Sequence, residues 1–270
     1  MTGRRNGRVL RWRAAIAALS AVLCAFAAFP AGGQVNGSKH DFSGEPAGDS
    51  QTGVCTMCHT PHGGIQSQMA WNHTLSQNTH FWTEGSTDDG TPFPTIDPSW
   101  GGVSKLCLSC HDGSVAIGDI AWFNAQEWTG GNAVDNQDHN GDNVQIGNAS
   151  GNLTGNHPFA FPYPWAGMAS TYNGVTSSVG AVLSGWKADP TMDGIRLFNQ
   201  SGSTVFAGTT TGSTGIECAS CHDPHDGPDV QDDMFLRGST DAGDGNYICR
   251  KCHQTMGDYE RQDQLFPHNQ

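Results

Sequence analysis

The apolar residues of this chain are thinly spread, and few stretches show the spacing of a regular helix or strand. Residues 114–122 predict a short helix, whereas residues 178–183 and 194–198 predict short strands. Residues 201–215 are mostly Ser, Thr and Gly and predict a loop or hairpin. The pattern therefore predicts a chain that is mostly coil, with short helices and few short strands.

The longest apolar run, residues 14–29, is too short and too rich in Ala for a membrane span. Five arginines precede this run and small residues follow it, which is typical of a secretory signal. We expect residues 1–33 to be removed on export, and cleavage after Ala27 and cleavage near Gly33 both fit the sequence. Cys24, the odd one of nine cysteines, would leave with the signal. We expect no membrane span in the mature chain.

Acidic residues dominate the charge of the chain. It has 13 basic and 26 acidic residues, a net charge of −13 with neutral histidines. Five of the basic residues and none of the acidic ones lie in the predicted signal, so the mature chain would have 8 basic and 26 acidic residues, about −18. Such a field disfavours nucleic acid and anionic lipid as partners. It suits an exported protein whose partners are cationic or mineral.

The eight remaining cysteines form four copies of Cys-X-X-Cys-His. The pairs are Cys55 and Cys58, Cys107 and Cys110, Cys218 and Cys221, and Cys249 and Cys252. An accidental match is expected only about 0.01 times in such a chain. This spacing is the attachment signature of c-type haem, in which two thiols bond to one porphyrin and the adjacent His binds the iron. Four motifs predict four covalently attached haem c groups. The 36 glycines leave little material for an aliphatic core, so we expect the chain to wrap around the haems.

Two other interpretations of the paired cysteines fit less well. A disulfide framework is common in exported chains, but it does not explain the fixed spacing or the His after every pair. Zinc bound by two such pairs gives no reason for the adjacent His either. We therefore prefer haem.

The motifs divide the mature chain into two pairs. We expect one tetrahaem cytochrome domain over residues 34–270, with the first haem pair in 34–122, a haem-free insert in 123–216 and the second pair in 217–270. Residues 55–64 read C-X-X-C-H-T-P-H-G-G and residues 218–227 read C-X-X-C-H-D-P-H-D-G. We call these the long motifs. Each is followed by a shorter motif, so a duplicated two-haem unit is the simple explanation.

Histidine is abundant enough to supply two ligands for every iron. The proximal ligands would be His59, His111, His222 and His253. The candidates for the distal side are His40, His62, His73, His157 and His225, which makes five residues for four places. Ligation by histidine alone predicts low reduction potentials, because an axial methionine would raise them.

His62 and His225 are the strongest distal candidates. Each lies three residues after a proximal His, with a Pro between them that stiffens the segment. This spacing is too short to reach over the same haem but suits the distal face of a neighbouring one. His157 is held in an extended conformation by the Pro that follows it, and His73 ranks fifth. We expect the other histidines to be solvated, namely His80, His139 and His268.

The sequence C-X-X-C-H-[TD]-P-H resembles the doubled-CXXCH multihaem c-type cytochromes, and the resemblance runs from about residue 40 to residue 253. Further stretches resemble the tetrahaem branch that polymerises into extracellular cytochrome nanowires. They are H-D-F-S at 40–43, W-N-H at 71–73, K-L-C-L-S-C-H-D-G at 105–113 and N-H-P-F at 156–159. The resemblance implies bis-histidine haems stacked in alternating parallel and perpendicular pairs, and one His donated across a subunit interface. His40 is the expected donor.

The expected function is electron conduction, as the subunit of an extracellular filament or, alternatively, as a monomeric periplasmic shuttle. A multihaem reductase is a further alternative, but an enzyme needs an open iron position and the histidine surplus argues that every iron is capped. We therefore expect no catalytic residues. The expected partners are other cytochromes, extracellular acceptors such as metal oxides or other cells, and further copies of the chain. The expected location is extracellular or at the cell surface, otherwise periplasmic.

Overall fold

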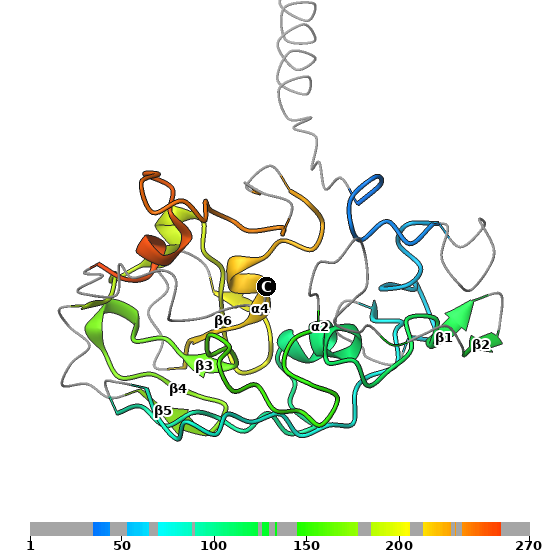
Figure 1. Ribbon diagram of the computed structural model, residues 1–270, viewed down its shortest axis with the longest axis horizontal. Helices are drawn as coiled ribbons and strands as arrows, with labels where there is room; N and C mark the ends of the chain where they lie inside the picture. The colour runs from blue at the N-terminus through cyan, green and yellow to red at the C-terminus, as the bar shows by residue number, and fades with distance from the viewer. Residues whose placement is uncertain are drawn as a thin grey trace, which may run out of the picture. The chain divides into compact units, whose positions relative to one another are not determined.

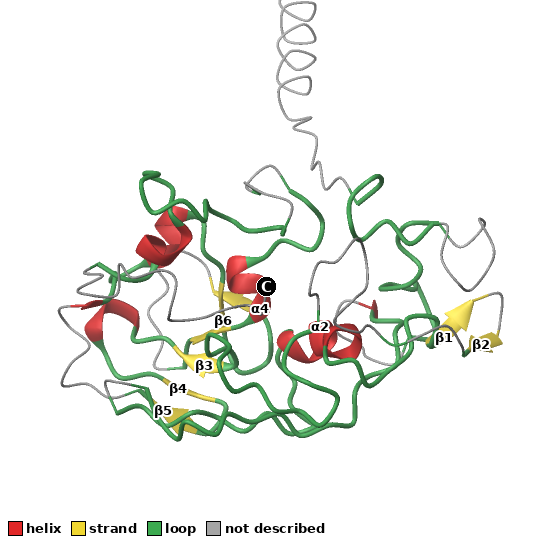
Figure 2. Ribbon diagram, viewed as in Figure 1, coloured by secondary structure: helices red, strands yellow, loops and turns green. Residues whose placement is uncertain are grey.

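Loops and turns make up most of the chain (Figures 1 and 2). The computed structural model describes residues 35–43, 53–64, 70–87, 90–123, 126–129, 133, 145–177, 185–205, 213–227, 230 and 234–254. These residues belong to one compact unit, Gln34–Gln270. The predicted signal, the strand expected at 178–183, His139 and His268 lie outside the described residues.

The regular elements are short. The helices are α2 (Ser104–His111), α4 (Cys218–Cys221) and the 3-10 helices η2 (Trp165–Gly167), η3 (Pro190–Asp193) and η4 (Ile248–Lys251). The strands are β1 (Ile120–Phe123), β2 (Gln126–Trp128), β3 (Phe161–Pro162), β4 (Thr171–Tyr172), β5 (Val175–Thr176), β6 (Leu197–Phe198), β7 (Thr204–Val205) and β8 (Gly215–Ile216). This content agrees with the predicted coil-rich fold.

A small antiparallel sheet lies in the predicted insert, with the strand order β3-β8-β6-β7. Strands β6 and β7 form a hairpin in which Leu197 pairs with Val205. Strand β3 joins the sheet through β8, with Phe161 opposite Ile216. The short strand predicted within residues 194–198 is therefore confirmed at β6. Two further ribbons, β1-β2 and β4-β5, have two strands each.

The helix predicted at residues 114–122 is wrong. Helix α2 lies before this segment and ends at His111. The Asp112 side chain then accepts the N–H of Ser114 at 2.8 Å, and Gly113 has a φ of +73°, so the chain turns away. The end of the segment forms β1, where β-branched and aromatic residues favour a strand.

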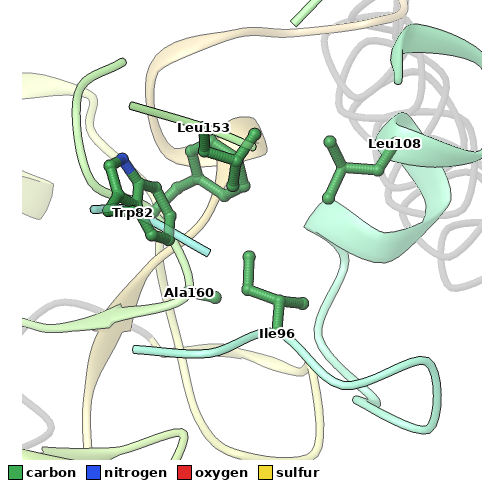
Figure 3. Close-up of a cluster of buried hydrophobic side chains, with 6 residues drawn as sticks. Trp82, Ile96, Leu108, Leu153 and Ala160 are labelled. Carbon is green, nitrogen blue, oxygen red and sulfur yellow. The ribbon is translucent and has the colours of Figure 1, made fainter. Parts of the chain in front are cut away.

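The second motif is anchored by its own variable residue. Leu108, which follows Cys107 in α2, is fully buried in a cluster with Trp82, Ile96 and Leu153 (Figure 3). Full burial of such a side chain stabilises the fold by about 2 kcal/mol. The cluster therefore ties α2 to loops that precede and follow it in the sequence.

The third and fourth motifs also pack against apolar clusters of the predicted insert. Ile248 and Cys252 border a cluster that includes Tyr163, Leu197 and Ile216. Ala219, inside the third motif, borders a smaller cluster; its buried members are Val103, Tyr172 and Phe198. The insert is thus a scaffold of mainly aromatic and β-branched side chains on which attachment motifs are held.

Candidate functional site

Each attachment motif folds into one helical turn, which places its two cysteines on one side of the turn. In three motifs the N–H of the proximal His donates to the C=O of the first cysteine. These bonds run from His59 to Cys55 at 2.8 Å, from His222 to Cys218 at 3.0 Å and from His253 to Cys249 at 2.9 Å. The remaining motif lies within α2. All four motifs therefore share the local shape that attachment to one porphyrin needs.

An antiparallel bridge holds the proximal His of three motifs from the opposite side. In each of the three motifs, the residue after the His donates its N–H to a carbonyl of the opposing segment. The carbonyl of the second cysteine accepts an N–H from the same segment. The residues opposite are Trp71 for His59, Leu236 for His222 and Trp186 for His253. All three are apolar, and the rings of Trp186 and His253 have centroids 4.4 Å apart. Backbone bonds on both sides therefore fix the main chain at these three proximal histidines.

Seven of the eight motif cysteines are partly buried, and Cys55 is exposed. All eight are free, which does not support a disulfide framework. Burial raises the pKa of Cys58 to about 11 and the pKa of Cys110 and Cys221 to about 12. Among the residues that the structure describes, no group of three or more His, Cys, Asp or Glu is placed to hold a metal ion.

Two proximal histidines face a second imidazole at a spacing that fits one iron between them. The ring centroids of His59 and His225 are 6.0 Å apart, with planes at 26°. Those of His111 and His40 are 6.1 Å apart, with planes at 53°. Two imidazoles that share one metal ion through bonds of about 2 Å have centroids about 6 Å apart. The residues therefore fit the haem that the motifs imply.

The ring nitrogens of three histidines are oriented in the same way. Nδ1 lies 3.2 Å from the Pro224 oxygen in His40, 2.9 Å from the Pro158 oxygen in His157 and 2.8 Å from the Met234 oxygen in His222. An Nδ1–H that donates to a carbonyl leaves the lone pair on Nε2. Metal-binding histidines typically donate their other N–H in this way. These three imidazoles are thus preset to offer Nε2 as a ligand.

Two half-buried imidazoles are held in the neutral form. Burial lowers the pKa of His253 to about 4, and the positive charge of His157 acts in the same direction. Burial, followed by the charge of His111, also lowers the pKa of His40 to about 4. A neutral imidazole is the form that binds a metal. The effect also shows that His157 lies within electrostatic range of His253.

The two other distal candidates lie elsewhere. His62 is exposed, and its ring meets Trp122 edge-on with centroids 5.4 Å apart. His73 is buried, and its Nε2 lies 3.1 Å from the carbonyl oxygens of Ala116 and Ile117. Its Nδ1 lies 2.9 Å from the oxygen of Thr74. With carbonyl oxygens at both nitrogens, His73 is suited to hold a loop rather than an iron.

The expectation that His80 is solvated is wrong. Its side chain is fully buried, and Nε2 lies 3.0 Å from Oδ2 of Asp112, the residue after His111. Burial opposes ionisation of Asp112, but hydrogen bonds from His80, Ser76 and Ser114 outweigh it and lower its pKa to about 2. His80 and Asp112 are 32 positions apart, so no local pattern marks the pair.

Two buried carboxylates beside the third motif were also missed. Asp223, directly after His222, lies 3.1 Å from Arg237 and 3.6 Å from Arg196. Glu217, directly before Cys218, is 1% exposed. Buried carboxylates are rare unless they are paired. The sequence does contain a signal for these two residues, because each acidic side chain lies directly beside a motif that must pack against haem.

Comparison with known proteins gives one result. Residues 212–258, which include the third and fourth motifs, match the model of a family described as Doubled CXXCH motif. No curated protein matches the chain. Within the described residues, no helix combines the length and apolarity needed to cross a membrane. The match and the geometry support a multihaem c-type cytochrome, in which CXXCH motifs bind haem c covalently for electron transfer.

Proposed function

We propose that this chain is an exported, low-potential tetrahaem cytochrome that conducts electrons as the subunit of an extracellular filament. The observation that carries the proposal is the spacing of about 6 Å between proximal and distal imidazoles, measured for His59 with His225 and for His111 with His40. Bound haem iron takes up and releases single electrons, and two imidazole ligands keep its potential lower than a His and a Met would.

The paired histidines join segments that are far apart in the sequence. His225 extends from the third motif to His59 of the first. His40 extends from the N-terminal segment to His111. The ring of Phe235 stacks on the ring of His40, with centroids 4.6 Å apart. We also assign His157 to His253, because the charge of His157 lies close enough to lower the pKa of His253. Ligation and folding are therefore coupled in this proposal, and the chain without haem would be largely unfolded.

The fourth distal ligand in this proposal is His62. It has the same position in the first long motif as His225 has in the third. Since His225 faces the proximal His of the other long motif, the same relation assigns His62 to a haem at His222. The exposed ring of His62 lies against Trp122 rather than beside a proximal His, so we propose that it reaches the haem of a neighbouring copy of the chain. His40, the donor implied by the resemblance, lies instead against His111 of its own chain.

The charge of the chain is consistent with this role. The excess of 26 acidic over 13 basic residues favours partners that are cationic or mineral and keeps an exported protein soluble. Every iron would carry two imidazoles, so substrate would find no open position on a haem, which argues against a reductase.

The proposal is tested on the secreted, haem-loaded protein. Intact mass spectrometry is expected to show four haems per chain, and electron microscopy is expected to show filaments. A monodisperse monomer at high concentration would indicate a shuttle instead. Fewer than four haems would contradict the tetrahaem assignment.

A further inference from the structure

We propose that Glu217 is a positioning residue that holds the second and third attachment motifs together, so that the haems bound at Cys107 and Cys218 meet at one fixed contact. The inference rests on the proposed electron-conducting function, because electron exchange between haems depends on their spacing. It concerns a carboxylate outside the CXXCH motifs and outside the proposed set of ligands.

Glu217 lies where two helices begin. Its Oε2 accepts the N–H of Ser104, the first residue of α2, at 3.0 Å. Its side chain also accepts the N–H of Ser220 in α4, while the Ser220 hydroxyl accepts the N–H of Glu217 at 2.9 Å. The first N–H groups of a helix have no partner within the helix. One carboxylate therefore supplies partners to the beginnings of both attachment helices.

The contact between the helices is reciprocal. The hydroxyl of Ser104 accepts the N–H of Cys218 at 2.8 Å, so α2 also caps α4. Helices α2 and α4 lie next to each other (Figure 2). The thiol of Cys107 lies close enough to that of Cys218 to raise its pKa. The first thiol of the second motif and the first thiol of the third therefore lie near each other, and each would attach a different haem.

The surroundings of Glu217 exclude water and leave little freedom. Its Oε1 accepts the hydroxyl hydrogen of Tyr172 at 2.6 Å. A Cβ added to Gly102 would lie 2.2 Å from Oε1, so only glycine fits there. Tyr172 also packs with Val103 and Phe198 in an apolar cluster. In such an environment hydrogen bonds are strong and an unmet donor is costly, so the network has one favoured arrangement.

Burying a carboxylate costs desolvation free energy, so it is an inefficient way to stabilise a fold. Apolar residues of the same volume often stabilise as well or better, and buried polar groups are best explained where they specify one geometry. Here the geometry specified is the register of α2 against α4. Loss of the carboxylate would leave the N–H of Ser104 without this partner, whereas the N–H of Ser220 would keep its bond to the backbone C=O of residue 217 at 2.8 Å. The beginning of α2 would then move away from α4 to reach water.

The test compares Glu217→Ala and Glu217→Gln with the wild-type holoprotein. Interacting porphyrins give an exciton couplet in circular dichroism of the Soret band, and its amplitude depends on their distance and orientation. We expect Glu217→Ala to lose the part of the amplitude that the second and third haems contribute, while it keeps the wild-type haem content and low-spin spectrum. Glu217→Gln keeps one acceptor oxygen, and we expect its couplet to lie closer to that of the wild type.

Glu84→Ala is the matched control, because the Glu84 side chain accepts the N–H of Gly155 at 2.7 Å on the surface, away from the motifs. Its couplet should equal that of the wild type. A wild-type couplet in Glu217→Ala, with only its thermal stability lowered, would overturn the proposal. If Glu217→Ala does not fold, the test uses Ser104→Ala and Tyr172→Phe, which remove one hydroxyl each from the same network. A weaker couplet in either supports the proposal, and a wild-type couplet in both overturns it.

Failure of the proposed function would give a different result. A high-spin, ligand-binding haem in the wild-type protein would contradict conduction through fully ligated haems. The couplet of the Glu217 variants would still report whether the second and third haems have moved.

Discussion

The two long motifs share a sequence but differ in what surrounds them. Both close the same helical turn, with the N–H of His59 bonded to Cys55 and the N–H of His222 bonded to Cys218. The residue after the proximal His is Thr60 in the first motif and Asp223 in the third. Thr60 donates its hydroxyl hydrogen locally, to the oxygen of His62, at 2.7 Å. Asp223 accepts the N–H of His225 locally at 3.2 Å and also lies against two distant arginines, Arg196 and Arg237.

The difference shows that the motif sets the turn and the neighbours set the direction of the second His. His225 follows an ionic cluster and faces His59 across the molecule. His62 follows a locally bonded Thr and lies against Trp122. The duplicated sequence thus sets His225 beside a proximal His of its own chain and His62 against a Trp, although both side chains are exposed.

The strongest test of this comparison removes each distal His in turn. We expect His225→Ala to convert one of the four haems, the one at His59, to a high-spin state that binds carbon monoxide, because that iron loses its sixth ligand. Filament assembly should persist. Electron paramagnetic resonance and carbon monoxide titration measure the change, and electron microscopy measures assembly.

The same substitution in the first long motif should affect filament assembly rather than the ligation of the haem at His59. We expect His62→Ala to abolish filaments while the haem at His59 stays low-spin. His73→Ala is the control for a buried His outside the proposed ligand set, and no haem should become high-spin in it. The unassembled His62→Ala variant is compared with unassembled wild-type protein. If only the variant has an additional high-spin haem, His62 is a ligand within its own chain, and the proposed interface role is contradicted.

The next largest effect concerns the ionic cluster. Asp223→Thr makes the third motif resemble the first, and it removes the carboxylate that lies 3.1 Å from Arg237. Arg237 is 1% exposed, so its charge would remain buried without Asp223, and we expect a loss of about 3 to 5 kcal/mol in the free energy of unfolding. Denaturant unfolding of the holoprotein measures it. Lys187→Ala breaks an exposed ion pair with Asp193 and should cost less than about 1 kcal/mol. Equal losses would refute the burial argument.

A smaller effect is expected at the second motif, where Asp112 has the position of Thr60 and Asp223. Its pKa is about 2 in the folded chain, below its ordinary value of 3.8. The unfolded chain therefore takes up this proton first, and the stability that Asp112 contributes is present above about pH 4 and is lost as the pH falls towards 2. Asp112→Asn should cost about 1 to 3 kcal/mol at pH 7 and flatten this acid limb. An unchanged limb in the variant would show that another carboxylate causes it.

The smallest effect concerns the turn after each long motif. Gly63 has a φ of +76°, and the equivalent Asp226 has a φ of +51°. Side chains are disfavoured in this left-handed region, so Asp226→Gly should stabilise the fold by up to about 1 kcal/mol. Gly63→Ala should destabilise it, because the added Cβ would lie 2.8 Å from Trp122. Thermal unfolding measures the stability of both variants. If their midpoint temperatures shift in the same direction, the two turns are not equivalent.

Local patterns predicted the parts of this molecule that depend on local chemistry. The spacing of Cys and His marks the attachment turns, the scarcity of aliphatic residues predicts coil, and residues 194–198 predict strand β6. Sequence reasoning also named His40 and His225, which the structure places opposite proximal histidines, although their role as ligands remains a prediction.

Contacts between distant segments were beyond sequence reasoning. The pairing of His80 with Asp112 spans 32 positions, and that of Glu217 with Ser104 spans 113. The bridges that place Trp71 and Trp186 beside proximal histidines have no local signature. The helix expected at 114–122 failed because a short apolar run does not distinguish helix from strand. Tertiary context decided each of these cases.

The central claim is that every haem iron in the assembled protein has two histidine ligands. Electron paramagnetic resonance of the native filaments, recorded with and without carbon monoxide under reducing conditions, tests it most directly. The account predicts only low-spin bis-histidine signals and no carbon monoxide complex. A high-spin signal, or a haem that binds carbon monoxide in intact filaments, would contradict it and favour an open, catalytic iron.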